Sequence, residues 1–190
     1  MNLTLSSNDH LNATYTEEDG TPLYQVTTPF SFTSKTATIK KAIPEFAEGT
    51  AALFTADHRY GSLAHVEFHA FVSSIMRIDG EEVKTSAFFT KGRFTLTALG
   101  RGRTFVGPDR REYQWILGHR TPTLVLNDEA RTLVAKFHVK HYGIFRKARP
   151  PFLEISQLGM HMVDLILITF VYIEKLRRDY ERARNRGVGS

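Results

Sequence analysis

The feature that most constrains the fold is a nearly continuous apolar segment close to the C-terminus. Residues 162–173 read MVDLILITFVYI, so a helix there is apolar on almost every side. Such a helix needs apolar partners all round it. Residues 174–186 read EKLRRDYERARNR, with Leu176, Tyr180 and Ala183 at helical spacing and a favourable Glu174–Arg178 pair. The pattern predicts one continuous helix with a buried first half and a solvated second half.

The uncharged part of this helix is too short to cross a membrane. The stretch from Leu165 to Ile173 carries no charge, and extending it back to Met162 takes in Asp164. A bilayer span needs roughly twenty apolar residues, about twice what this stretch offers. The partner predicted for the helix is therefore the rest of the chain and not lipid.

Most of the chain before residue 156 alternates apolar and polar side chains with a period of two. This alternation is typical of strands that bury one face. The clearest runs place on one side Ala64, Val66 and Phe68; Phe94, Leu96 and Ala98; Tyr113, Trp115 and Leu117; and Leu133, Ala135, Phe137 and Val139. Turn sequences such as Asp79-Gly80 interrupt the runs. The sequence predicts roughly ten to twelve strands joined by hairpins, no helix before residue 156, and an irregular connection over residues 40–50.

A barrel is the architecture that best accommodates both patterns. A closed barrel of about twelve strands is wide enough to hold a helix, whereas smaller barrels are filled by side chains alone. A helix on one face of an open sandwich, the alternative, would leave Leu, Ile and Phe side chains in water. The sequence thus predicts a mainly β fold, an antiparallel barrel enclosing a hydrophobic C-terminal α-helix. Residues 1–176 would form this single domain, with the threaded helix from about residue 157, and residues 177–190 a basic helical extension and tail.

Five segments carry a family resemblance: Thr104-Phe105-Val106-Gly107-Pro108-Asp109, Tyr113-Gln114-Trp115, Pro122-Thr123-Leu124-Val125-Leu126, His141-Tyr142-Gly143-Ile144-Phe145, and residues 162–176. They resemble an uncharacterised domain family common in mushroom-forming fungi. The resemblance covers about residues 21–176. More broadly, the pattern is similar to the tubby C-terminal-like group, which includes tubby domains, phospholipid scramblases and LURP-one-related proteins.

The wider resemblance implies a twelve-stranded barrel around a hydrophobic C-terminal helix. For function it implies binding of phosphoinositides or of a membrane surface. The basic residues with which tubby domains do this have no recognisable counterpart positions here. The calcium-binding segment and palmitoylated cysteines of scramblases are not recognisable either, which puts a scramblase-like activity in doubt. The fungal family has no assigned activity to carry over.

The composition removes several functional classes. The chain has no cysteine, which excludes disulfides, thiolate catalysis and Cys-based zinc sites. Its polar N-terminus has no apolar region of the kind found in secretory signals, which favours a cytoplasmic protein. The formal net charge is +5, a modest excess that is compatible with binding to phosphates or to an anionic surface.

Basic residues gather in two regions that are candidates for ligand binding. The first comprises Lys91, Arg93, Arg101, Arg103, Arg110 and Arg111, and the second Lys140, His141, Arg146, Lys147 and Arg149, with Tyr142 and Phe145 among them. Arg and Lys beside aromatic rings can clamp phosphates. The residues chosen as candidate ligands are Lys140, His141, Tyr142, Arg146, Lys147, Arg149, Arg101 and Arg103. The alternative is a solvated sheet face, which also fits the tail because its arginines alternate with acids.

Other chemistry finds little support. The Gly-x-Ser-x-Gly elbow, phosphate-loop patterns and nucleic-acid-binding motifs are absent from the sequence. His65 and His69 lie on one side of a strand but about 13 Å apart, too far to share a metal. No cofactor or metal is expected. Asp164, at the edge of the apolar helix, must find a partner or hold a shifted pKa.

These observations lead to one functional hypothesis and two rivals. The leading hypothesis is a non-enzymatic binding module for an anionic ligand or a membrane-surface lipid headgroup. Its expected partners are an anionic lipid or a phosphate-bearing ligand, and its expected place is the cytoplasm, with peripheral association at membranes. The rivals are a protein-interaction or self-assembling structural module, which would bind another protein or a second copy, and an enzyme of unrecognised type.

Overall fold

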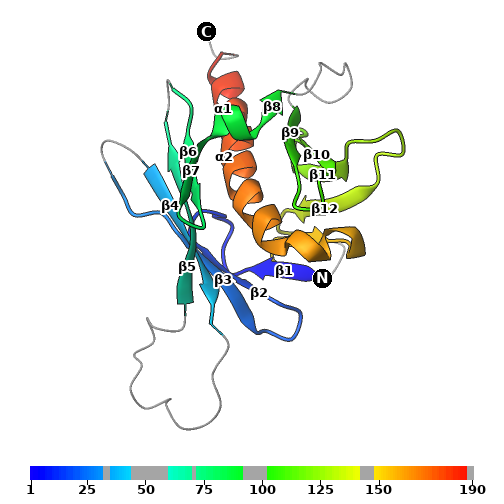
Figure 1. Cartoon of the computed structure of the whole chain (residues 1–190). Helices are drawn as coiled ribbons and strands as arrows, with labels where there is room; N and C mark the ends of the chain where they lie inside the picture. Colours follow the sequence, from blue (N-terminus) through cyan, green and yellow to red (C-terminus); the bar gives the residue numbers. More distant parts are fainter. Residues whose placement is uncertain (32–34, 44–59, 70–71, 92–101, 142–147, 188–190) are drawn as a thin grey trace.

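The computed structural model describes residues 1–31, 35–43, 60–69, 72–91, 102–141 and 148–187 (Figure 1). They form one antiparallel 13-stranded sheet, two helices and one 3-10 helix. The strands are β1 (Asn2–Leu5), β2 (Ala13–Thr16), β3 (Pro22–Thr27), β4 (Lys35–Ala42), β5 (Tyr60–Phe68), β6 (Ile75–Ile78), β7 (Glu81–Lys84), β8 (Thr90–Lys91), β9 (Gly102–Val106), β10 (Glu112–Ile116), β11 (Thr123–Leu126), β12 (Leu133–His138) and β13 (Phe152–Ile155). The helices are α1 (Thr85–Phe88), the 3-10 helix η3 (Gln157–Met162) and α2 (Val163–Gly187).

The sheet curls around α2 (Figure 1). Its order is β7-β6-β5-β4-β3-β2-β1-β13-β12-β11-β10-β9-β8, so the one pairing between strands distant in sequence is β1 with β13. Leu3 pairs with Leu153 there and joins the N-terminal hairpins to the C-terminal ones. In the described part of the chain, the end strands β7 and β8 do not pair with each other, and α1 connects them. The predicted mainly β, antiparallel fold around a C-terminal helix is confirmed, although hydrogen bonds do not close the sheet.

The apolar half of α2 is enclosed by the protein's own strands, as predicted. Every side chain from Ile166 to Ile173 is buried, and Phe170 is completely so. The Phe170 ring lies 4.9 Å from the ring of Phe137 on β12 and 6.2 Å from that of Trp115 on β10. The indole Nε1 of Trp115 donates a 3.0 Å hydrogen bond to the Thr169 hydroxyl, which satisfies both polar groups inside the core.

The helical segment Gln157–Gly187 has the length and mean hydropathy of a candidate membrane span. More than half of its most apolar window, 56%, is nevertheless buried inside the protein. The side chains of the buried half contact the curled sheet, which occupies the place that lipid would take around a span.

Three details of the sequence prediction are wrong. Leu133 is 40% exposed and Val139 50%, while Val134 and Ala135 are both buried. A β-bulge in the pairing of β11 with β12, between Leu124 and Val125, leaves Val134 as the extra residue and shifts the alternation. The short helix α1 was not predicted because four residues carry no helical period. The connection expected from residue 40 starts later, because β4 continues to Ala42.

Other expectations are confirmed where the structure describes the residues. Tyr113 and Trp115 are completely buried core residues. Asp79 and Gly80 both have positive φ, 52° and 83°, as a tight two-residue hairpin turn between β6 and β7 requires. The predicted strand at Phe94–Ala98 lies outside the described residues.

Candidate functional site

Antiparallel strands send every second connection to the same end of a sheet. At one end, here called the mouth, lie the described parts of the connections β1–β2, β3–β4, β5–β6, β7–β8, β10–β11 and β12–β13, together with the charged half of α2. Two backbone carbonyls in these connections accept hydrogen bonds from arginines of the helix. Arg178 Nη2 donates to the carbonyl of Asn8 at 3.0 Å, and Arg177 Nη1 donates to that of His119 at 3.1 Å.

The two ends of the sheet carry opposite charge. Among the described residues in or next to the mouth connections and on the charged half of α2, the cations are Lys35, Lys84, Lys91, Arg103, Arg120, Lys140, Arg149, Lys175, Arg177, Arg178, Arg182, Arg184 and Arg186, and the acids are Asp9, Glu67, Glu174, Asp179 and Glu181. At the opposite end, the acids are Glu17, Glu18, Asp19, Asp79, Glu81, Asp109, Glu112, Asp128, Glu129 and Asp164, and the cations are Lys40, Lys41, Arg110, Arg111 and Arg131. The mouth is therefore the end that attracts anions.

A buried carboxylate organises the start of the charged half of α2. Glu174 is completely buried and accepts hydrogen bonds from Arg177 at 2.7 and 3.0 Å and from Arg178 at 2.7 Å. Burial works against the charge of Arg177, but its bonds to Glu174 and Glu181 raise the Arg177 pKa above its ordinary value. The predicted Glu174–Arg178 pair is confirmed, while the solvated half of α2 begins later than predicted because Glu174 and Arg177 are both buried.

The most strongly charged cavity at the mouth, here called the basic pocket, has a volume of about 730 Å³. It lies between the β1–β2 connection, the β3–β4 connection and α2. Its lining cations are Lys35, Lys175, Arg177, Arg178 and Arg182, and its acids are Asp9 and Glu181. Burial opposes the charge of Asp9, but hydrogen bonds from Asn12 at 2.8 Å and from the Leu11 N–H at 3.1 Å lower its pKa.

His10 lines the basic pocket and is 1% exposed. Neither ring nitrogen has a hydrogen-bond partner among the described residues. The Val171 backbone lies close enough to favour the charged ring slightly, but it does not form a hydrogen bond with it. Burial first, and the positive charge of Arg178 second, lower the pKa of His10 to about 3. The imidazole is therefore neutral at physiological pH and offers one N–H donor and one acceptor, both unused.

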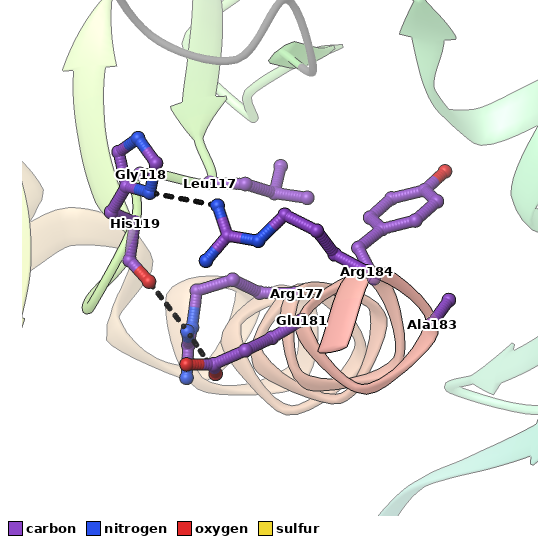
Figure 2. Close-up of a pocket in the computed structure, with 8 residues that line it drawn as sticks. Leu117, Gly118, His119, Arg177, Glu181, Ala183 and Arg184 are labelled. Carbon is purple, nitrogen blue, oxygen red and sulfur yellow. Dashed lines mark hydrogen bonds and ion pairs between the residues drawn. The ribbon is translucent and has the colours of Figure 1, made fainter. Parts of the chain in front are cut away.

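A smaller pocket, with a volume of about 280 Å³, lies between the β10–β11 connection and α2 (Figure 2). Its cations are already paired with neighbours: Arg184 Nη1 lies 3.3 Å from His119 Nδ1, and Arg177 bonds to Glu181 and to the His119 carbonyl. Gly118 shapes the turn, because it has a φ of +62° and a Cβ there would lie 2.5 Å from the Thr121 carbonyl oxygen. This pocket offers fewer unsatisfied groups to a ligand than the basic pocket does.

A third cavity of about 700 Å³, here called the seam pocket, lies between the β5–β6 connection, the segment from α1 to β8, and α2. Lys91, Arg103 and Lys175 contribute its positive charge. The hydroxyls of Ser73 and Thr85, also in its lining, lie 3.1 Å apart and hydrogen-bond to each other. Lys175 lines both this cavity and the basic pocket, so the two adjoin one another across α2.

The predicted ligand residues are only partly described. Lys140, His141 and Arg149 are exposed on the β12–β13 connection at the mouth, where the backbones of His141 and Arg149 exchange hydrogen bonds of 3.0 and 3.1 Å. Arg103 lies on β9 and lines the seam pocket. The remaining four, together with Arg93 and Phe145, lie outside the described residues: Arg101, Tyr142, Arg146 and Lys147. None of the described four lines the basic pocket.

The first predicted basic cluster is not one cluster. Arg103 lies at the start of β9 and Arg110 and Arg111 follow its end, so the strand carries them to opposite ends of the sheet. The role of His10 was not predicted from the sequence. Its burial depends on α2, which is distant in the chain and places the Phe170 ring 6.1 Å from the imidazole.

The end opposite the mouth holds two carboxylates with phenol partners. Asp164 accepts a short hydrogen bond from the hydroxyl of Tyr24 and pairs with Lys41 at 2.8 Å, so it has the partner that its position demanded. Burial and this carboxylate raise the pKa of Tyr24. Burial, followed by a 2.7 Å hydrogen bond to Asp109, raises the pKa of Tyr113 to about 12. These groups stabilise the fold.

Histidines do not assemble a metal centre in the described part of the chain, where no group of three or more His, Cys, Asp or Glu side chains converges. His65 lies 3.3 Å from the Thr38 hydroxyl and 3.2 Å from that of Ser62, and His69 lies 3.4 Å from Glu67. Both side chains are thus held by their neighbours on the sheet.

Comparison with known proteins gives one family. The model of a family of unknown function, DUF6593, matches residues 8–179, which include the basic pocket's His10, Lys35, Arg177 and Arg178. No curated protein and no solved structure matches the chain.

Proposed function

From the geometry of its mouth we propose that this chain, which belongs to the DUF6593 family of unknown function, is a non-enzymatic binding module for a phosphate-bearing anion. The anion belongs either to a lipid headgroup or to a soluble molecule, and it binds in the basic pocket. The observation that carries the proposal is the pocket's combination of positive charge with a buried imidazole at His10 whose ring nitrogens have no hydrogen-bond partner among the described residues.

The charge in the basic pocket is only partly neutralised by the protein. The Lys35 side chain has no hydrogen bond or ion pair among the described residues, and Arg182 has a single acidic partner, the half-exposed Asp179, at 3.2 Å. Arg177 and Arg178 share Glu174, and Lys175 pairs with Asp179, so the remaining positive charge of the pocket lies mainly at Lys35 and Arg182. Phosphate oxygens are strong acceptors for guanidinium and ammonium donors, and such charge-assisted bonds are about twice as strong as neutral ones.

His10 adds a donor without adding charge. A buried polar group without a partner is costly, so an oxygen atom that accepts its N–H bond removes a penalty already present in the free protein. The pocket volume of about 730 Å³ falls within the range of about 300–1,000 Å³ that small-molecule sites occupy. A phosphorylated headgroup or sugar fits this size and charge.

The hydroxyls at the mouth support a binding role over catalysis. Ser73 and Thr85 hydrogen-bond to each other, and among the described residues neither is paired with a histidine or carboxylate that would activate it. A nucleophilic hydroxyl needs such a base within hydrogen-bond reach.

Calorimetric titration with inositol trisphosphate, beside co-sedimentation with phosphatidylcholine vesicles with or without phosphatidylserine or a phosphoinositide, tests the proposal. The double variant Lys35→Gln/Arg182→Gln should bind at least about tenfold more weakly, the cost of one charge-assisted hydrogen bond. The matched control is Arg110→Gln, an exposed cation at the opposite end. Absence of binding to both probes at low salt, or equal loss in the control, would contradict the proposal.

A second function is favoured by the open edges of β7 and β8. An unpaired strand edge can add a strand from another chain, which would make the protein an interaction or self-assembling module. Light scattering measures the oligomeric state, and hydrogen exchange measures whether the edge strands are protected by another chain. A monomer over a wide concentration range, with no added protection of β7 or β8, would count against this function.

We also infer that the family is related to the tubby C-terminal-like group and that this member is fungal, cytoplasmic and peripheral at membranes. The support is the segments quoted from the sequence, together with an antiparallel sheet curled around α2. A crystal structure whose strand order differed from that of tubby domains would reject the relation, and cell fractionation would test the location.

A further inference from the structure

Resting on the proposed function, we propose that the mouth is a membrane-docking face, with Phe30 and Val72 as apolar anchors that enter an anionic bilayer beside the basic pocket. This inference names the source of the phosphate as a lipid headgroup and gives the protein an orientation on the membrane.

The two anchors are the most exposed large apolar side chains in the described part of the chain. Phe30 is 81% exposed and Val72 69%. Phe30 lines the basic pocket and Val72 the seam pocket, so each stands at the rim of a positively charged cavity. An exposed phenyl ring at a charged rim gains from burial among acyl chains while neighbouring cations stay at the headgroups.

The anchors come from adjacent connections of the sheet. Phe30 lies in the connection that enters β4 at Lys35, and Lys35 pairs with Phe68, the residue at which β5 leaves for the connection of Val72. Lys175 of α2 lines both cavities, and its ammonium group lies 5.3 Å from the centre of the Phe68 ring. Two lysines therefore stand in the same part of the mouth as the two apolar anchors.

The opposite end of the sheet cannot dock in the same way. Its most exposed large apolar side chain, Val106, is 59% exposed but precedes the turn that holds Asp109. The acids gathered at that end would be repelled by anionic lipid. Among the described residues, strongly exposed apolar side chains and an excess of positive charge coincide only at the mouth. This combination favours a bilayer surface over a soluble anion, because apolar anchors contribute nothing to binding a soluble anion.

Vesicle binding of the variant Phe30→Ser/Val72→Ser tests the inference against inositol trisphosphate as the soluble probe. We expect affinity for phosphatidylserine or phosphoinositide vesicles to fall at least about tenfold, while affinity for the soluble probe stays within about twofold of the unmodified protein's. Val106→Ser, the matched control, should change neither. If the double variant binds vesicles as tightly as the unmodified protein does, the proposal of docking through these anchors is wrong. If the unmodified protein binds neither the vesicles nor inositol trisphosphate, the proposed function itself is wrong.

A second measurement reads the depth of the anchors directly. Because the chain has no cysteine, single variants Phe30→Cys, Val72→Cys and Val106→Cys can each carry one environment-sensitive fluorophore. Anionic vesicles should shift the emission of the first two labels to the blue and leave the third unchanged. Equal shifts at all three positions, or a shift at Val106 alone, would overturn the orientation.

Discussion

The two halves of α2 differ in their surroundings, because one is buried in the core and the other lies at the mouth. From Ile166 to Ile173 every side chain is buried against the curled sheet, whereas from Glu181 to Gly187 every residue is exposed at the mouth. The change occurs across Glu174 and Arg177, which are buried but charged and paired. The helix that fills the core therefore also carries four of the five cations of the basic pocket, Lys175, Arg177, Arg178 and Arg182, so stability and binding can be separated by position along it.

Placing a charge in the apolar half gives the largest expected effect. Ile168→Asp or Phe170→Asp buries an unpaired carboxylate and should cost more than about 4 kcal/mol, enough to unfold the domain. Circular dichroism during thermal unfolding measures this. Ala183→Asp, on the exposed half, is the control and should stay within about 0.5 kcal/mol. An unchanged melting temperature for Ile168→Asp would contradict enclosure of the helix.

Removing the buried charge between the halves comes next. Glu174→Gln leaves Arg177 and Arg178 without their shared carboxylate and should destabilise the protein by about 3 kcal/mol. Denaturant unfolding gives the value. Asp179→Asn, which loses a partly buried pair with Lys175 and an exposed pair with Arg182, should cost less than about 1 kcal/mol. Similar losses in the two variants would show that the boundary is not a buried ionic network.

His10, which packs against the apolar half of α2, should make the stability of the protein depend on pH. Burial, then Arg178, lowers the folded-state pKa of His10 to about 3 from its ordinary 6.5, so below pH 6.5 the unfolded chain takes up a proton that the folded one does not. Stability should therefore fall as pH drops from about 6.5, by up to about 1.4 kcal/mol per pH unit from this group. His10→Leu removes this part, so its free energy of unfolding should fall less steeply. Parallel pH profiles would argue that His10 titrates normally.

The smallest effect is expected at the end of the exposed half. Ending the chain after Arg184 removes residues that are exposed where the structure describes them. The free energy of unfolding should therefore change by no more than about 0.5 kcal/mol, with little shift in the melting temperature. A loss of several kcal/mol on calorimetry would mean that the end of α2 packs against the protein.

The sequence predicted those parts of the fold that depend on local patterns. All-round apolarity identified the core half of α2, and alternation placed Tyr113 and Trp115 in the core. The prediction from local patterns was wrong at Val134, because a bulge depends on the partner strand β11. It also missed α1, because a helix of four residues is too short to show a helical period. The predicted closure of the barrel is not seen between β7 and β8 in the described part of the chain, because closure depends on how far the sheet curls.

The site was predicted less well, and the reason is topological. Residues near one another in sequence, such as Arg103 and Arg110, are carried apart by β9, whereas His10, Lys35 and Arg178 come together from distant elements. Basic composition indicated an anionic ligand, but only the tertiary structure brings a buried imidazole beside the cations of α2.

The most direct test of the central claim follows the imidazole of His10 by NMR during titration with inositol trisphosphate. If the basic pocket holds a phosphate, the ring nitrogen signals of His10 and the guanidinium signals of Arg178 shift and saturate together, while those of Arg110 at the opposite end stay unchanged. Saturation without any shift at His10, or shifts confined to the opposite end, would contradict the account.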